Sequence, residues 1–398
     1  MKNSVEYIDD IKNVIKNIPD AEALKGCDIL VTGATGLIGS AVADILLVLN
    51  KECGYGMKLY LAGRKIEGVA ERFSDYEEGR DYFFVKYDAT KQVTDLIAVD
   101  YIVHGASNAD PAKISSEPVE TMLANIMGLN GLLSAADKDK LKRVLYISSS
   151  EVYGVGGISD KKEGAETGTE DGVSKNGVDA GKIDGASEDG KDGASEDGKD
   201  GASDKPEYYS RLFKENDLGY VDILSPRSSY PSSKRAAETL CIAYAEEYKV
   251  DAVIVRPGHI YGPLIKLSDS RASALFSLKA AKGENIVMKS LGEQLRSYCH
   301  VLDCASAILA VLIKGENRNA YNISAKQAIV TIREMAEEFA AAGGVEIVFD
   351  VPTDAEKKSY NVMPCSALNA EKLEALGWKA AFDMKAGAEQ TVRELRNR

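Results

Sequence analysis

Short apolar runs alternate with helical patterns along most of the chain. Before them, Val5, Ile8, Ile11, Ile15 and Ile18 recur at helical spacing and predict an amphipathic helix over residues 4–18, packed outside the catalytic unit. From residue 27 onwards, apolar runs without polar alternation predict strands at 27–32, 58–62, 82–87, 100–103, 143–148 and 251–256. Helical spacing fills the segments between them, for example 37–49, 118–137 and 232–248.

Strands without alternation are typical of a parallel sheet that helices cover on both faces. The strand–helix repetition predicts an α/β fold, a Rossmann-type doubly wound parallel sheet with a smaller C-terminal substrate-binding cap. We expect residues 1–25 to be an N-terminal helical extension and 26–256 to form the sheet domain. The pattern after residue 256 is mixed, with helices predicted at 275–282, 305–313 and 332–342, so 257–398 is expected to be mainly the cap.

Residues 155–206 interrupt the sheet domain with a different composition. The sequence DGASEDGK occurs at 184–191 and again at 192–199, and residues 155–205 hold 14 acidic residues, 7 basic residues and 12 of the 35 glycines. Such a segment cannot bury enough apolar surface to offset chain entropy, so a low-complexity, acidic, disordered insertion on a surface loop is predicted. A calcium-binding repeat is the alternative, but the bidentate Glu and flanking helices of an EF-hand are missing.

The charge of the chain excludes some classes of partner. Its net charge is -13, of which residues 155–205 contribute -7, and a nucleic acid or anionic membrane would instead require a basic face. The six cysteines form no CxxC pair and the three histidines show no metal-ligand spacing, so buried thiols and no metal site are predicted. Without an apolar run of membrane-spanning length or a signal-peptide pattern, we expect a cytoplasmic protein.

Residues 33–39, GATGLIG, follow the first predicted strand and begin a helix. Glycines at such a turn let a pyrophosphate approach the backbone at the helix N-terminus, which predicts an NAD(P)-binding domain. The cofactor-binding residues here are Gly33, Thr35, Gly36, Leu37, Ile38 and Gly39. NAD is expected, but Arg64 stands where an acid would bind the NAD ribose, so NADP is possible unless Arg64 is merely exposed. Asp88 either binds the adenine amino group or belongs to a turn.

A second group of candidates follows the fifth predicted strand, at SSSEVYG (148–154) and YPSSK (230–234). Ligands bind at the carboxyl ends of strands in open α/β sheets. Tyr230 and Lys234, four residues apart on a predicted helix, share one face, so the ammonium can stabilise a phenolate and lower the Tyr230 pKa towards that of a general base. YxxxK occurs by chance, but the glycine motif and the Ser-rich strand end favour catalysis over a structural role.

The chain resembles the extended short-chain dehydrogenase/reductases, in their nucleotide-sugar epimerase/dehydratase branch. The resemblance covers residues 24–398 apart from the insertion, and seven blocks in family order carry it: GATGLIGS (33–40), HGAS (104–107), NIMGLNGLL (125–133), YISSSEVYG (146–154), PRSSYPSSKRAAE (226–238), RPGHIYGP (256–263) and VLDCASAI (301–308). It implies a nucleotide-sugar substrate, UDP-linked, and a homodimer formed through residues 118–137 and 232–248.

Roles follow from the resemblance position by position. Ser149 matches the family's catalytic Ser/Thr, Tyr230 its base and Lys234 the lysine that holds the nicotinamide ribose. Further cofactor contacts are implied for Ala106, Asn125 and Pro257. Substrate contacts are implied for Ser107, Ser150, His259, Arg271 and Arg296. His259 replaces an Asn that contacts the substrate phosphate in many members, whereas Arg296 matches the Arg that binds the nucleotide diphosphate and Arg271 is a second candidate.

The reaction depends on the residues after Ser149. Hexose 4,6-dehydratases have Thr-Asp-Glu there, UDP-glucuronate decarboxylases have Thr-Ser-Glu followed by Val-Tyr-Gly, and simple 4-epimerases usually lack an acid at the Glu151 position. Ser149-Ser150-Glu151 therefore looks most like the decarboxylases, with Glu151 positioning or reprotonating C5 of a 4-keto sugar, or only capping the site wall. Epimerisation and dehydration stay open. A non-catalytic dinucleotide-binding scaffold is the alternative of another class, and it predicts loss of Ser, Tyr or Lys.

Overall fold

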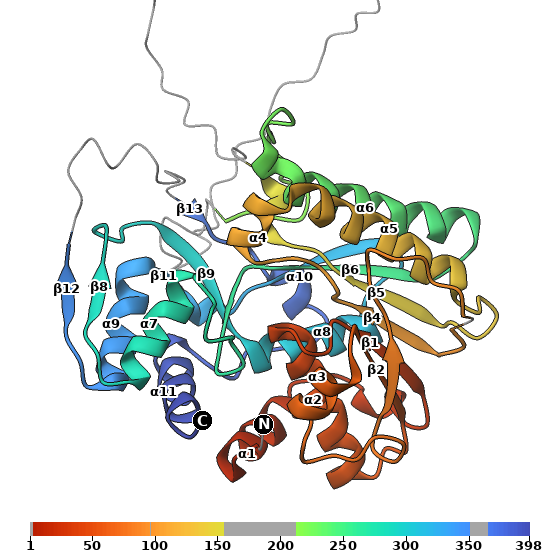
Figure 1. The fold of residues 1–398 in the computed structure, drawn as a ribbon, viewed down its shortest axis with the longest axis horizontal. Coiled ribbons are helices and arrows are strands. Elements are labelled where there is room, and N and C mark those ends of the chain that lie inside the picture. The colour runs from red at the N-terminus through yellow and green to blue at the C-terminus, as the bar shows by residue number, and fades with distance from the viewer. Residues whose placement is uncertain (1–2, 96, 155–211, 351–364) are drawn as a thin grey trace, which may run out of the picture.

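The computed structural model describes residues 3–95, 97–154, 212–350 and 365–398. The acidic insertion predicted at 155–206 lies outside these described residues. The chain forms a larger sheet-containing part and a smaller part, which lie side by side, and the N- and C-termini are close together at one side of the molecule (Figure 1).

Seven parallel strands form the central sheet, in the order β10-β6-β5-β4-β1-β2-β3. They are β1 (Asp28–Thr32), β2 (Lys58–Gly63), β3 (Phe83–Lys86), β4 (Tyr101–His104), β5 (Arg143–Ile147), β6 (Ala252–Pro257) and β10 (Asn319–Ile323). The strand order reverses between β1 and β4, which places a ligand crevice at the carboxyl ends of these strands. The predicted Rossmann-type doubly wound sheet is confirmed.

Helices cover both faces of this sheet (Figure 1). One face carries α4 (Pro111–Ser116), α5 (Pro118–Ala135) and α6 (Ser229–Glu247). The other carries α2 (Leu37–Cys53), α3 (Ile66–Arg72) and α8 (Val301–Lys314), with α1 (Val5–Ile15) packed against α2 and α8. The predicted N-terminal helix is thus present, and it lies on the outside of the α2–α8 layer.

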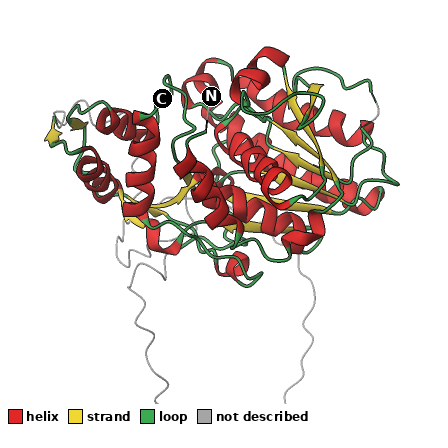
Figure 2. Ribbon diagram, turned by 90° about the horizontal axis from the view of Figure 1, so that it is seen from below, coloured by secondary structure: helices red, strands yellow, loops and turns green. Residues whose placement is uncertain are grey.

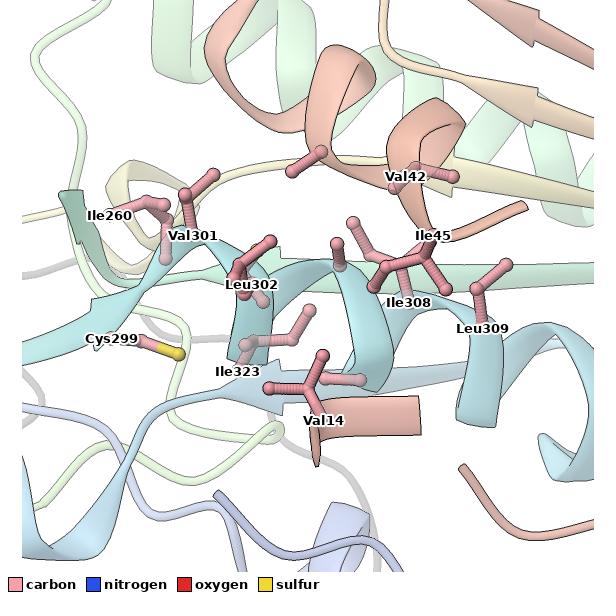
Figure 3. Packing of buried hydrophobic residues seen from close by; sticks show 14 of the residues in the cluster. Val14, Val42, Ile45, Ile260, Cys299, Val301, Leu302, Ile308, Leu309 and Ile323 are labelled. Carbon is pink, nitrogen blue, oxygen red and sulfur yellow. The ribbon is translucent and has the colours of Figure 1, made fainter. Parts of the chain in front are cut away.

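Successive strand residues point into the two different helix layers. Ile29 and Val31 of β1 belong to the apolar cluster under α2 and α8, whereas Leu30 belongs to the cluster under α5 and α6. Figure 3 shows the first cluster, in which Leu302 and Ile308 of α8 pack towards α2 and α1. Burial on both sides is why the strands read as continuous apolar runs in the sequence.

The smaller part is built on three helices and short strands (Figure 2). Its helices are α7 (Ala272–Ala281), α9 (Ile332–Gly343) and α11 (Met384–Arg396), and a short α10 (Glu371–Glu374) packs against β10. β7 (His259–Tyr261), β9 (Leu295–His300), β11 (Ile329–Thr331) and β13 (Cys365–Ser366) form a second sheet, and β8 (Ile286–Met288) pairs with β12 (Ile347–Phe349). β7 continues directly from β6, so this part begins at the carboxyl edge of the central sheet.

The six predicted strands agree with β1 to β6 within a residue at each end, and the seven predicted helices are all present. The seventh strand, β10, was not predicted. Together with α8 it comes from the segment expected to be mainly the cap, although it completes the central sheet. Four of the six cysteines are buried, while Cys53 is exposed and Cys365 is half-buried.

Candidate active site

The glycine motif forms a tight turn between β1 and α2. Gly33 has φ +71°, and a Cβ placed on it would lie 2.8 Å from the Gly105 carbonyl and 2.9 Å from the Ala106 nitrogen. The turn therefore packs directly against the loop that follows β4. Gly36 is the N-cap of α2 and no side chain caps this helix, so the first N–H groups and the positive end of the helix dipole face the turn. A phosphate fits this arrangement.

Thr32 and His104 hold the loop after β4 in place. Thr32 Oγ1 accepts hydrogen bonds from the Gly105 and Ala106 nitrogens, both at 3.2 Å, and pairs with His104 Nδ1 at 2.8 Å. Because the hydroxyl accepts twice, it donates its proton to Nδ1, and the imidazole proton is assigned to Nε2. Burial, aided by the charge of Lys234, lowers the His104 pKa to about 3, so the ring is neutral. Sequence reasoning gave neither residue a role, although His104 lies in the HGAS block.

Arg64 and Asp88 lie together at the ends of the neighbouring strands β2 and β3. Arg64 is exposed and Asp88 is half-buried. Asp88 Oδ1 accepts hydrogen bonds from the Thr90 nitrogen at 3.1 Å and the Thr90 hydroxyl at 2.7 Å. Burial acts to raise the Asp88 pKa, but the Thr90 hydrogen bonds and the charges of Lys91 and Arg64 outweigh it and lower the pKa. A carboxylate and a guanidinium are thus both presented on this side of the crevice.

The Ser149 turn meets Tyr230 at the carboxyl end of β5. A short 3-10 helix, η2 (Ser150–Tyr153), begins here, and the Ser149 hydroxyl accepts a hydrogen bond from the Glu151 nitrogen at 3.2 Å. Its proton is thereby left for Tyr230, with which Ser149 also hydrogen-bonds. Burial strongly raises the Tyr230 pKa and the Glu151 charge raises it further, while the Ser149 hydrogen bond and the Arg271 charge oppose the rise. The structure therefore brings Ser149, Glu151 and Tyr230 together.

Lys234 lies on the same face of α6 but does not bind Tyr230. Its Nζ donates to the Ile147 carbonyl at 2.8 Å and lies 4.7 Å from the centre of the Tyr146 ring and 5.7 Å from that of Tyr230. Burial lowers the Lys234 pKa to about 7, although Glu238 opposes the fall. The predicted lowering of the Tyr230 pKa by Lys234 is therefore wrong: the Tyr230 pKa is raised overall, and the Lys234 ammonium binds the Ile147 carbonyl instead.

Asn125 joins α5 to α6 beside Lys234. Its Nδ2 donates to the Thr121 carbonyl at 3.1 Å and to the Ser233 hydroxyl at 3.0 Å, and that hydroxyl in turn donates to the Tyr230 carbonyl at 3.0 Å. Buried atoms near the crevice that have no hydrogen-bond partner among the described residues include His104 Nε2, Ser107 Oγ, Asn125 Oδ1 and Ser148 Oγ. Buried polar groups are normally paired, so this set fits a polar ligand such as a dinucleotide.

Glu151 follows β5 in the larger part, and His259 begins β7 at the start of the smaller part. Both side chains are open to solvent, yet the surrounding protein sets their pKa values. Burial raises the Glu151 pKa, with Arg227 of η4 (Pro226–Ser228) opposing it. Burial and the charges of Arg296 and Arg271 lower the His259 pKa to about 4, so its ring is neutral at pH 7.

Two arginines from the smaller part lie near His259. Arg296 of β9 is 9% exposed and burial lowers its pKa, while Arg271 begins α7 and forms a salt bridge with Asp269 at 2.5 Å. The Arg271 charge acts on both Tyr230 and His259. The structure therefore places Arg271 and Arg296 near His259, and Arg271 also near Tyr230, although these residues come from elements that are far apart in the sequence.

The remaining candidates lie at the same edge of the sheet. Pro257 is the buried last residue of β6, and Ser150 is the half-buried first residue of η2. Thr35 is exposed, while Leu37 and Ile38 are half-buried in the first turn of α2. No group of three or more His, Cys, Asp or Glu side chains within the four described ranges could hold a metal ion. The helices of these ranges include none that is long and apolar enough to cross a membrane.

Sequence comparison gives one matching family, described as the NAD dependent epimerase/dehydratase family, over residues 29–176 and 206–324. The UDP-glucuronic acid decarboxylase 1 of Xenopus tropicalis is 24% identical over 92% of this chain and 72% of its own length. The UDP-glucuronic acid decarboxylase 3 of Arabidopsis thaliana is also 24% identical, over 90% of this chain and 86% of its own length.

Two solved structures show the same fold. The UDP-glucose 4-epimerase of Thermotoga maritima, in complex with UDP-glucose, superimposes with a TM-score of 0.65 and 21% identity, covering 93% of this chain and 99% of its own. The dTDP-glucose 4,6-dehydratase of Bacillus anthracis, in complex with NAD, gives a TM-score of 0.61 and 20% identity, covering 92% of this chain and 96% of its own. At these identities the likeness is one of fold.

Proposed function

The chain belongs to the NAD-dependent epimerase/dehydratase family, and on this premise we propose that it decarboxylates a UDP-linked uronic acid through a 4-keto intermediate. The family establishes an enzyme. The substrate class is supported by the curated relatives, which are UDP-glucuronic acid decarboxylases, and by the residues that surround Tyr230.

One observation carries the choice of reaction, namely that the Glu151 carboxyl lies close enough to Tyr230 for its charge to act on the phenol. The Glu151 charge raises the Tyr230 pKa, and burial raises the pKa of Glu151 itself. A glutamate with a raised pKa can hold a proton at the pH where a neighbouring tyrosine works. Decarboxylation needs such an acid, because the carbanion formed at C5 must be protonated.

The cofactor site fits a nicotinamide dinucleotide. When bound, this cofactor supplies a hydride acceptor for C4 of the sugar and carries a positive charge in its oxidised form. The glycine turn would hold the pyrophosphate, and the unpaired Asn125 Oδ1 and Ser107 Oγ supply polar contacts. NAD is the proposed cofactor. NADP is the second candidate, because exposed Arg64 can pair with a 2′-phosphate.

Tyr230 is the proposed general base. Its phenolate takes the proton of the sugar 4-hydroxyl as C4 is oxidised to the ketone, and Ser149 donates a hydrogen bond that stabilises the phenolate. The C5 carboxylate is then β to a ketone. The bond from C5 to the carboxylate breaks, carbon dioxide leaves, and the electron pair becomes an enolate. Glu151 donates a proton to C5, and Tyr230 returns its proton to the 4-oxygen when C4 is reduced again.

Positive and neutral polar groups would hold the substrate on the opposite wall. Arg296 and Arg271 would bind the diphosphate, and neutral His259, on which both charges act, can donate or accept a hydrogen bond without adding charge. Ser107 and Ser150 are the proposed sugar contacts from the larger part. Contacts from these two hydroxyls would keep C4 near the base.

A homodimer is the proposed assembly. Helix α5 exposes Val119 (63%), Leu123 (47%) and Met127 (54%), which recur at helical spacing on one side of the helix. An exposed apolar stripe of this kind is typical of an interface rather than of a solvated helix. Sedimentation of the purified protein tests the assembly, and a monomer at micromolar concentration would contradict it.

The test of the reaction is mass-spectrometric turnover of the NAD-loaded protein on a panel of nucleotide sugars that includes UDP-glucuronate. Loss of carbon dioxide from UDP-glucuronate is expected. Glu151→Gln should slow carbon dioxide release or C5 protonation by about 100-fold, whereas Glu284→Gln, an exposed glutamate of the smaller part, should have no effect. A product of unchanged mass and new retention time would instead identify a 4-epimerase, and loss of water a dehydratase.

A further inference from the structure

Arg256 of β6 connects the segments that carry the proposed catalytic residues. It is 6% exposed, and its Nε and Nη2 donate to the two carboxylate oxygens of Glu238 at 2.9 and 2.6 Å. Its Nη1 donates to the Tyr153 hydroxyl at 3.0 Å and to the Glu215 carbonyl at 2.7 Å. The guanidinium thus binds α6, the η2 turn and the segment after residue 212 at once.

The partners of Arg256 lie one step away from the proposed catalytic residues. Glu238 follows Lys234 by one turn of α6 and Tyr230 by two, so it shares their helix face. Tyr153 ends the 3-10 helix that Ser149 caps, and its hydroxyl donates to Asn322 Oδ1 of β10 at 2.6 Å. A rigid chain of hydrogen bonds therefore runs from α6 through β6 to the Ser149 turn.

Burial of the Arg256–Glu238 ion pair costs free energy, so its presence calls for a role other than stabilisation. Removing two charges from water costs several kcal/mol that the ion pair only partly returns, so a buried pair is weak evidence for stability. Here the two parallel hydrogen bonds to Glu238 and the two from Nη1 satisfy the guanidinium. Two parallel hydrogen bonds between a guanidinium and a carboxylate also fix the orientation of the two groups, and here they fix the helix that carries Glu238.

We propose that Glu238 and Arg256 are positioning residues, whose buried pair holds Lys234 and the Ser149 turn in register with Tyr230. The inference rests on the proposed function for its catalytic meaning. The charge of Glu238 also acts directly on Lys234, because burial lowers the Lys234 pKa and Glu238 limits that fall. The other titratable groups around the ammonium are Tyr230 and Cys241 on the same helix, and Tyr146 and His104 on the sheet.

The experiment compares Glu238→Gln, which keeps the shape and removes the charge, with Asp251→Asn. Asp251 forms the matching two-bond pair with Arg143 at the other ends of β5 and β6, at 2.8 and 2.9 Å. Each variant is loaded with NAD and assayed on UDP-glucuronate. Glu238→Gln should lower kcat by about 10- to 100-fold with KM nearly unchanged, because a small displacement of catalytic groups costs this much. Asp251→Asn should leave kcat unchanged.

A second readout does not depend on turnover. The protein is labelled with 13C at the lysine ε carbons, the Lys234 signal is assigned with Lys234→Met, and its titration is followed by NMR. Glu238→Gln should move the Lys234 titration to lower pH, and Asp251→Asn should not. If the wild type leaves UDP-glucuronate unchanged while this shift is seen, the proposed reaction fails and the positioning role stands.

Two results would overturn the positioning role. One is an unshifted Lys234 titration in Glu238→Gln. The other is an unchanged kcat in folded, active Glu238→Gln. Should Glu238→Gln not fold, Tyr153→Phe replaces it, because this variant keeps the ion pair and removes the hydroxyl that links the pair to the Ser149 turn and to Asn322 of β10. It should lower kcat several-fold with the Lys234 titration unchanged, and a wild-type kcat would overturn the proposal.

Discussion

Polar groups are paired with one another at the amino edge of the central sheet, whereas several are buried without a partner at its carboxyl edge. At the amino edge, charges at the starts of the strands pair with one another. Arg143 binds Asp251 through two hydrogen bonds, Lys140 binds Asp28, and Lys142 binds Asp100 at 3.2 Å. Each of these acids has a partner from an adjacent strand or from the loop before one. The amino edge is therefore closed by its own side chains.

At the carboxyl edge, polar groups are buried without being paired. His104 Nε2, Ser107 Oγ, Asn125 Oδ1 and Ser148 Oγ have no partner within the described part of the chain. A buried polar atom without a hydrogen bond costs about 1–3 kcal/mol. The charged residues named at the amino edge include no such unpaired atom among the described residues. The paired charges stabilise the amino edge. The unpaired buried atoms make the carboxyl edge less stable and leave their hydrogen-bonding capacity for a ligand.

Substitution of the proposed base should give the largest effect. Tyr230→Phe removes the hydroxyl that takes the 4-hydroxyl proton, so kcat should fall by about a thousandfold or more, while NAD affinity measured by calorimetry stays within a few-fold. Tyr244→Phe is the matched control, since Tyr244 is a buried tyrosine on the same helix, hydrogen-bonded to Ser134 at 2.8 Å. Turnover retained by Tyr230→Phe would remove this tyrosine from the mechanism.

The glycine turn should give the next largest effect. A Cβ on Gly39 would lie 2.3 Å from the Gly33 carbonyl oxygen, so Gly39→Ala forces the turn open. Unfolding free energy should fall by about 1–3 kcal/mol, and NAD affinity should weaken about tenfold or more. Gly68→Ala is the control, because nothing lies within 4 Å of its added Cβ in α3 and alanine stabilises a helix by about 0.5–1 kcal/mol. Equal thermal shifts in the two variants would contradict the close packing of the turn.

Most strands of the central sheet could be predicted from the sequence, because strands buried on both faces appear as unbroken apolar runs. β10 was not predicted, because its sequence, Asn-Ala-Tyr-Asn-Ile, mixes polar and apolar residues. Its buried Asn322 is satisfied by contacts from Tyr153, Phe213 and Asn369, which only the folded chain brings near. No local pattern can show that a polar residue has such partners.

The site was predictable where a role depends on spacing along one element. The shared face of Tyr230 and Lys234 follows from their four-residue separation, but the binding of Lys234 to the Ile147 carbonyl does not. The electrostatic environment of His259 also depends on Arg271 and Arg296, which come from different elements. Environments built from several segments, and the pKa values that they set, require the tertiary structure.

Buried Lys234 should lower the free energy of unfolding at neutral pH. Burial lowers the Lys234 pKa from 10.5 to about 7. Between these values the unfolded chain holds a proton that the folded chain lacks, so the stability contributed by this residue rises with pH and is lost as pH falls towards 7. Lys234→Met should therefore raise the unfolding free energy by about 1–3 kcal/mol at pH 7, while abolishing turnover.

That gain should shrink as the pH rises towards 10. There the unfolded-state lysine approaches its own pKa of 10.5, so the free-energy cost of deprotonating Lys234 on folding becomes small. Chemical unfolding of the wild type and Lys234→Met from pH 6 to 10 measures the difference. A Lys234→Met variant that is less stable than the wild type at pH 7 would mean that the Ile147 hydrogen bond outweighs the cost of burial. The carboxyl edge would then be no less stable than the amino edge at this position.

The smallest effect should come from the amino edge. Asp100 accepts a hydrogen bond from the Asp28 nitrogen at 2.8 Å and pairs with Lys142, whose side chain is 55% exposed. Burial acts to raise the Asp100 pKa, but these partners and Lys140 outweigh it and lower the pKa. The contribution of Asp100 is thus present above the unfolded-state pKa and is lost as pH falls through the folded-state pKa. Asp100→Asn should cost under about 1 kcal/mol at pH 7, flatten the loss of stability below pH 4, and leave kcat unchanged. A fall in kcat would show that the two edges are coupled through the strands, and the separation of stability from function across this sheet would then be wrong.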